Sequence, residues 1–149
     1  MAAPDIVKGT YLDILLGDGA SPEVFNILCG LTTRSFTEQT NTNDNFVPDC
    51  ADPESVPFRE LIATGKQWDM QGEGLLNLAQ LDNVRAASGV LKNYRFVIGR
   101  PTGSTVGTGN FAGAAMITNL QIGGSSADGQ LASVNLTIAS SGAWTWNAA

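Results

Sequence analysis

The stretch Lys66-Gln67-Trp68-Asp69-Met70-Gln71-Gly72 decides the fold, because apolar and polar side chains alternate in it. A period of two is typical of a strand with one face on a core and the other in water. Trp68 and Met70 are therefore expected on the buried face and the polar residues beside them on the wet face. This stretch predicts a half-exposed strand.

Outward from this strand, most of the chain also has extended character, with β-branched residues and glycine-rich turns between segments. Further strands are predicted at residues 9–16, 23–40, 92–98, 111–122, 130–138 and 143–147. Residues 75–88 are rich in Leu and Ala and end at Gly89, which predicts the main helix. A short helix is predicted at 58–62, after a capping Ser55 and Pro57.

These elements predict a mainly β fold: a β-sandwich or barrel of about seven strands with one main α-helix. The length of 149 residues favours a single domain spanning 1–149. Residues 41–57 are rich in Asn, Asp, Thr and Pro, so a projecting loop or hairpin is expected there. Residues 99–110 are rich in Gly and Thr and are predicted to be another loop.

Composition limits the possible functions. Only 15% of the residues are charged, well below the usual level of about 25%, which indicates a surface largely hidden against partners. The net charge of −6 argues against nucleic-acid binding, which depends on Lys and Arg neutralising phosphates. There is no apolar signal region and no run of roughly 20 apolar residues, so a cytoplasmic chain is expected.

Catalytic and metal-binding patterns are weak. The chain has no histidine and two cysteines, too few ligands for a standard zinc site. The glycine-rich loop lacks the Gly-Lys-Ser/Thr of a phosphate loop, and the acidic residues of 41–57 miss the calcium-loop spacing. Asp69 and Glu73 lie close in sequence, and a pair of carboxylates is what glycoside hydrolysis uses, but surface charges are the favoured interpretation. No enzyme activity and no cofactor are expected.

Several motifs taken in order resemble a known family. Cys29-Gly30-Leu31-Thr32-Thr33-Arg34-Ser35-Phe36 is followed by Phe58-Arg59-Glu60-Leu61 and then by Gln71-Gly72-Glu73-Gly74. This order, with a closing segment over 111–143, is similar to the major tail tube proteins of siphophages (the TP901 type), and the likeness extends over residues 11–146. The cysteines and the length of 41–57 depart from the family pattern.

The resemblance implies a structural virion protein. Relatives form hexameric rings that stack into a hollow tube through which DNA leaves, in a phage or a gene transfer agent. The implied partners are other copies of the chain, a tape measure protein, and terminator and baseplate proteins; DNA passes without specific binding. Assembly is expected in the host cytoplasm and the final location in the virion tail. The alternative is a carbohydrate-binding or adhesive β-sandwich module of a tail tip.

The tube hypothesis assigns two sets of residues. The channel should be lined by the polar sides of the two strands with wet faces, and the candidates are Glu38, Thr40, Asp69, Gln71 and Glu73. The loop at 41–57 should contact another subunit or ring, and the candidates are Asp44, Phe46, Val47, Asp49, Asp52 and Glu54. The chain termini and the 99–110 loop are expected to add contacts.

Overall fold

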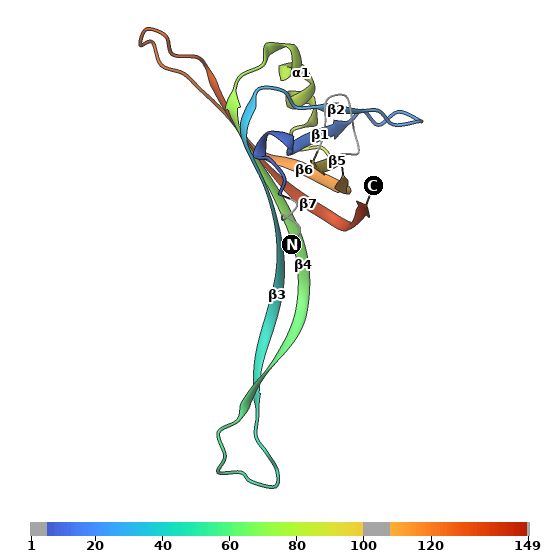
Figure 1. The fold of residues 1–149 in the computed structure, drawn as a ribbon, viewed down its shortest axis with the longest axis vertical. Coiled ribbons are helices and arrows are strands. Elements are labelled where there is room, and N and C mark those ends of the chain that lie inside the picture. The colour runs from blue at the N-terminus through green and yellow to red at the C-terminus, as the bar shows by residue number, and fades with distance from the viewer. Residues whose placement is uncertain (1–5, 100–107, 149) are drawn as a thin grey trace, which may run out of the picture.

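Seven strands form one antiparallel sheet in the order β2-β1-β5-β6-β7-β4-β3 (Figure 1). The computed structural model describes residues 6–99 and 108–148. The strands are β1 (Asp13–Gly17), β2 (Phe25–Ile27), β3 (Leu31–Val47), β4 (Phe58–Leu75), β5 (Lys92–Ile98), β6 (Gly109–Gly123) and β7 (Ser133–Ala148). Helix α1 (Leu78–Ala87) and a 3-10 turn (Gly9–Tyr11) complete the described part. The mainly β prediction with one helix is confirmed.

The sheet rolls over so that its two ends face each other. Phe36 of β3 stacks on Phe111 of β6 with ring centroids 4.3 Å apart, and it lies 5.4 Å from the ring of Phe96 in β5. Three strands separate β3 from β5 in the sheet, so only a strongly curved sheet permits these contacts. One core therefore fills the space between two halves, as the sandwich or barrel prediction requires.

The core contains the residues that the deciding stretch predicted. Trp68 is 2% exposed and Met70 is 1% exposed, and Ile138 of β7 is fully buried beside them. Helix α1 contributes Val84 and Ala87 to the same core. The helix begins later than predicted because the backbone of residues 72–75 is still paired with β7.

Two predictions about elements are wrong. Residues 58–62 are the start of β4, since they pair with residues 43–47 of β3. The ladder satisfies the backbone groups of both segments, which outweighs the weak local preference for a short helix. Residues 133–148 form one strand where a break was expected, because Gly142 at φ +86° lets the chain bend without ending the ladder.

The remaining differences concern boundaries. Residues 9–11 form the 3-10 turn, so the first strand starts only at Asp13. The predicted segment 23–40 is divided into β2 and β3 at Gly30, whose φ is +91°. The central part of the predicted 99–110 loop, residues 100–107, lies outside the described residues.

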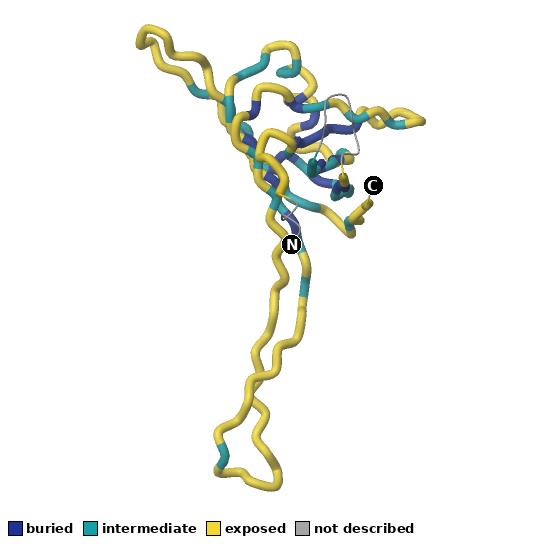
Figure 2. The backbone as a smooth tube through the Cα atoms, in the orientation of Figure 1, coloured by how far each residue is buried: buried dark blue, intermediate teal, exposed yellow. Residues whose placement is uncertain are grey.

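Strands β3 and β4 continue far beyond the body as a projecting hairpin (Figures 1 and 2). From residue 37 to residue 64 every residue is exposed except the partly buried Ser55. The strands stay paired as far as Val47 and Phe58, so the loop proper covers only residues 48–57. A hairpin of this kind has no core of its own, which makes it available for contacts with other chains.

Candidate assembly surfaces

The side of β3, β4, β7 and β6 that faces away from the core is polar. Paired residues of neighbouring strands point to the same side of a sheet, and Gln71 lies between Ser35 and Thr137. Extending this register defines a surface that we call the polar face: Thr33, Ser35, Thr37, Asp69, Gln71, Glu73, Asn119, Gln121, Asn135 and Thr137, with the apolar Ala139 and Met116 beside Asp69. It carries two carboxylates and neither Lys nor Arg. The amide of Asn135 donates to Glu73 Oε1 at 3.1 Å.

The structure divides the predicted channel residues between two sides of the sheet. Asp69, Gln71 and Glu73 lie together on the polar face. Glu38 is paired with the core residue Trp68 and so lies on the opposite side, where Trp144 Nε1 donates to Glu38 Oε1 at 2.8 Å. Thr40, two residues further along β3, is also on that side. The five residues therefore do not form one surface.

Sequence reasoning missed the part of the polar face on β6 and β7. The signal was present in β7, where Asn135 and Thr137 alternate with the buried Leu136 and Ile138. This alternation could not identify a surface of the whole sheet, because the sequence of β7 alone does not determine its register against β4. The polar face extends over four strands where two were expected.

The four strands of the polar face have an unpaired edge on each side. Among the described residues, no strand pairs with the far side of β3. On the other side, β5 pairs with β6 only over Gly109–Ala115, so the end of β6 is bonded to β7 and otherwise carries a single bridge from Ser88 to Ile117. Unpaired backbone groups at a strand edge readily accept a strand of another chain.

The far end of the hairpin is both apolar and acidic, and we call residues 44–60 the hairpin tip. Phe58 is 86% exposed and Phe46 is 64% exposed, unusual values for side chains of this size. The predicted contact residues Asp44, Phe46, Val47, Asp49, Asp52 and Glu54 all lie in this tip and are exposed. The structure therefore brings this whole set together.

Within residues 6–99 and 108–148, no cluster of three or more Cys, Asp or Glu side chains is arranged to hold a metal ion. No helix in this part of the chain is long and apolar enough to cross a bilayer. Cys29 and Cys50 are both exposed and have free thiols.

Comparison with known proteins agrees with this architecture. The model of a family described as phage tail tube protein matches residues 7–145. No curated protein matches in sequence.

Solved structures share the fold at low identity. A chain in the virion of a native gene transfer agent particle is 23% identical, with a TM-score of 0.70 over 95% of this chain and 98% of that one. A chain in the tail of an empty gene transfer agent particle, refined with C6 symmetry, is 22% identical with a TM-score of 0.71 over the same shares. A chain of the SPP1 tail tube is 11% identical, with a TM-score of 0.65 over 97% of this chain and 80% of that one. With the family match over nearly all of its length, the chain belongs to the phage tail tube protein family.

Proposed function

We propose that copies of this chain form hexameric rings that stack into the hollow tail tube of a phage or phage-like particle, with the polar face lining the channel. The observation that carries the proposal is the polar face itself, which has carboxylates, amides and hydroxyls without a cation and is bordered by two unpaired edges. A chain in the tail of the empty gene transfer agent particle, which was refined with C6 symmetry, has the same fold, and this supports six copies in a ring.

The two edges supply a way to close a ring. The free edge of β3 in one copy pairs with the end of β6 in the next, so that the polar faces join into one continuous wall. Different surfaces of the two copies meet at this contact, so it is heterologous. Such a contact forms a closed ring when a whole number of the rotations that relate neighbouring copies adds up to 360°. Asp69, Gln71 and Glu73 then face the channel, whereas Glu38 and Thr40 lie on the opposite side of the sheet.

The chemistry of the polar face suits the passage of DNA. Phosphates are held mainly by Lys and Arg, and a wall with Asp69 and Glu73 repels them. DNA then moves through the channel without specific binding. The hairpin tip contacts the neighbouring ring, a tape measure protein occupies the channel during assembly, and terminator and baseplate proteins bind the tube ends. The chain catalyses no reaction in this role and is located in the virion tail.

Electron microscopy of the concentrated protein tests the assembly. Hollow tubes with sixfold rings are expected, because neither unpaired edge is covered within one chain. A compact monomer that forms no rings at any concentration, measured by light scattering, would overturn the proposal and favour an adhesive module.

Cysteine labelling tests the channel in a Cys29→Ser/Cys50→Ser background. In tubes, Gln71→Cys should react with N-ethylmaleimide but be protected from a maleimide that carries a large polyethylene glycol. Asn83→Cys, on the exposed side of α1, is the matched control and should react with both reagents. Equal reaction of both variants with the large reagent in intact tubes would rule out the polar face as the channel wall.

A further inference from the structure

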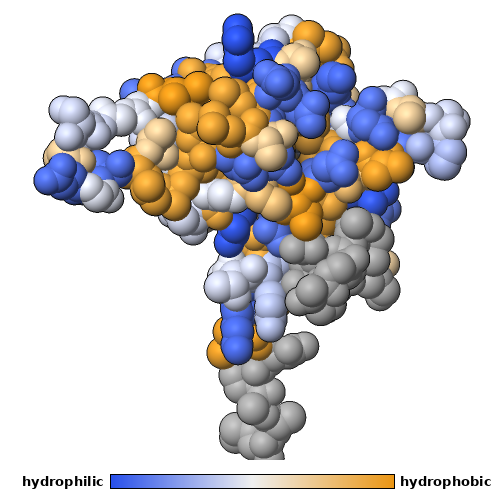
Figure 3. All heavy atoms as spheres, turned by 90° about the horizontal axis from the view of Figure 1, so that it is seen from above, coloured by the Kyte–Doolittle hydropathy of each residue, from blue (hydrophilic) through white to orange (hydrophobic). Residues whose placement is uncertain are grey.

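The chain contains the dipeptide Asp-Gly twice, at Asp18-Gly19 and at Asp128-Gly129. The first lies in the turn between β1 and β2, and the second lies in the turn between β6 and β7. Both turns project from the body, on opposite sides of it (Figures 1 and 3). All four residues are exposed, so water reaches both dipeptides.

The two glycines have nearly the same backbone conformation. The φ of Gly19 is +75° and that of Gly129 is +76°, and a Cβ added to either would meet nothing within 4 Å. The backbone nitrogen of a glycine is the least hindered nitrogen that can follow an aspartate, because glycine has no side chain. Exposure and glycine geometry therefore do not distinguish the two sites.

The hydrogen bonds of the carboxylates do distinguish them. Asp18 Oδ1 accepts a hydrogen bond from the backbone N–H of Ala20 at 2.9 Å and another from that of Val24 at 3.1 Å. The bond from Ala20, followed by that from Val24, stabilises the ionised form and lowers the pKa of Asp18 below its ordinary value. The carboxylate of Asp18 is therefore both held in place and kept ionised.

The carboxylate of Asp128 is not held in this way. Its turn is closed by a backbone hydrogen bond from Gln130 N–H to the carbonyl oxygen of Ala127 at 3.3 Å. Within residues 6–99 and 108–148, no hydrogen bond or ion pair engages the carboxylate of Asp128 or the N–H of Gly129. The side chain can therefore rotate toward the nitrogen that follows it.

We propose that Asp128-Gly129 is a site of spontaneous covalent modification, where aspartate isomerises to isoaspartate, and that Asp18-Gly19 is protected. The backbone nitrogen of Gly129 attacks Cγ of the protonated Asp128 carboxyl group. A bond between this nitrogen and Cγ forms, and the hydroxyl group leaves with the amide hydrogen as water, which gives a cyclic imide.

Water then opens the imide of residue 128 at one of its two carbonyl carbons. Attack at Cγ restores aspartate. Attack at the main-chain carbonyl carbon breaks its bond to the nitrogen and gives isoaspartate, whose main chain runs through Cβ and Cγ. The water lost in the first step is regained in the second, so the product is an isomer and no oxidant or further reagent is needed.

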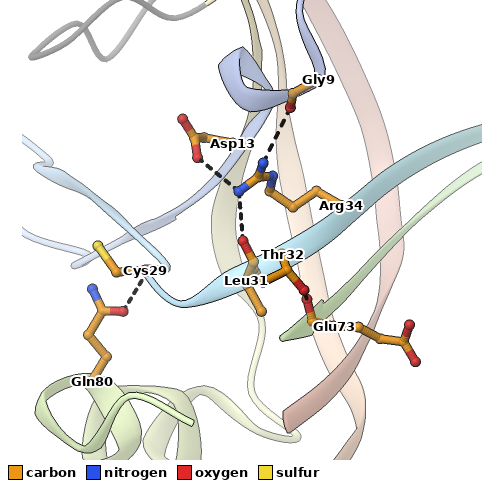
Figure 4. Close-up of polar contacts among 8 residues, drawn as sticks. All are labelled: Gly9, Asp13, Cys29, Leu31, Thr32, Arg34, Glu73 and Gln80. Atoms are coloured by element: carbon orange, nitrogen blue, oxygen red, sulfur yellow. Dashed lines mark hydrogen bonds and ion pairs between the residues drawn. The ribbon is translucent and has the colours of Figure 1, made fainter. Parts of the chain in front are cut away.

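Asp13 shows the arrangement that excludes this reaction. Its side chain is 10% exposed and lies 3.7 Å from Nη1 of Arg34 (Figure 4). The next residue is the β-branched Ile14, and both belong to β1, whose pairing fixes the main chain. An unhindered nitrogen, exposure to water and an unheld carboxylate are met together at Asp128.

The modification alters the turn and leaves the sheet in place. Isoaspartate adds one methylene to the main chain and keeps one carboxylate, while the ladder of β6 and β7 begins outside the turn, at Gly123 and Ser133. Since a subunit of a finished particle is not renewed, the isoaspartate content at residue 128 should increase with the age of the particle.

Ageing of the purified chain in warm neutral buffer tests this inference. Trypsin places the two sites in separate peptides, because it cleaves after Arg34 and Arg95. Isoaspartate in each peptide is measured by electron-transfer mass spectrometry and by methylation with an isoaspartyl methyltransferase. Two hydrogen bonds of ordinary net strength should make the reaction at Asp18 about ten- to a hundredfold slower than at Asp128.

Two variants and one solvent provide the controls. Asp128→Ser should abolish nearly all isoaspartate, and Asp18→Ser should leave its amount unchanged. In guanidinium chloride the hydrogen bonds of Asp18 are lost, so the two sites should react at similar rates. Equal reaction at both sites of the folded chain would overturn the inference, as would isoaspartate at Asp128 that forms only in guanidinium chloride.

Discussion

Gly74 lies where β4 passes closest to the start of β3. A Cβ at this position would overlap the carbonyl oxygen of Gly30 and lie 2.6 Å from both Leu31 Cα and Thr32 N. These are backbone atoms, which cannot move aside as a flexible side chain can. Gly74→Ala should therefore lower the free energy of unfolding by about 1–3 kcal/mol.

The measurement is urea unfolding at a concentration where the chain is monomeric. Gly124→Ala is the matched control, because a Cβ there meets nothing within 4 Å, and it should change stability by less than about 0.5 kcal/mol. Equal stability of the two variants would contradict the close approach of β3 and β4.

Tyr94 is fully buried in the core, and its hydroxyl has no hydrogen-bond partner among the described residues. Burial disfavours the phenolate and raises the pKa of Tyr94 from 10.0 to about 12. A raised folded-state pKa means that stability present below pH 10 is lost as the pH rises towards 12. Tyr94→Phe should remove this part of the alkaline destabilisation.

The difference in the free energy of unfolding between wild type and Tyr94→Phe reports the effect of Tyr94 alone, since Lys and other groups titrate equally in both chains. Urea unfolding at several pH values between 8 and 12 measures it. At neutral pH the variant should be as stable as the wild type or more stable by up to about 1 kcal/mol, because it buries no unpaired hydroxyl. Parallel stability curves across the whole range would contradict the prediction.

Among the elements, the β3–β4 hairpin marks the limit of local sequence reasoning. The alternation around Trp68 and Met70 predicted a half-buried strand correctly, because one face of that segment meets the core. Residues 58–62 were predicted as a helix because Ser55 and Pro57 form a plausible helix start. Only the partner strand at 43–47 makes them extended, and pairing between distant segments is absent from a local pattern.

The absence of strand pairing from a local pattern also explains why the predicted channel residues lie on two sides of the sheet. Polarity alone selected Glu38 together with Asp69, although their strands pair so that the two side chains point to opposite sides. The acidic and apolar residues of 44–54 lie together because they are adjacent in sequence, so no register was needed to group them, and their contact with another subunit stays a prediction. A local pattern can therefore group residues of one segment, whereas grouping residues of several strands needs the register of the sheet.

The hairpin tip is expected to serve assembly and not the stability of the body. Val47 and Phe58 are paired at its end, and neither contacts the core. Val47→Ser/Phe58→Ser should keep cooperative unfolding with a change of less than about 1 kcal/mol, while tube formation falls sharply because the apolar contact is lost. Asn43→Ser/Asn45→Ser, on the same side of β3, is the control and should form tubes. Loss of cooperative unfolding in the tip variant would contradict this separation.

At the scale of the whole molecule, the placement of charge decides what the tube does with DNA. Asp69 and Glu73 lie on the polar face, so Asp69→Lys/Glu73→Lys changes every subunit of the proposed channel wall from acidic to basic. Tubes assembled from this variant with linear DNA should retain DNA that a nuclease cannot digest, and wild-type tubes should retain none. Binding to lysines releases counterions, so retention should fall steeply between roughly 50 and 200 mM salt.

The control is Asp82→Lys/Asp128→Lys, which makes the same change in net charge at exposed positions outside the polar face. DNA attracted to these tubes is bound on an accessible surface, and the nuclease should remove it. Equal protection by both variants would mean that net charge, and not the polar face, governs the retention of DNA. Protection confined to the Asp69→Lys/Glu73→Lys tubes would mean that the acidic wall is what allows DNA to slide, because the two assemblies differ only in where their lysines lie.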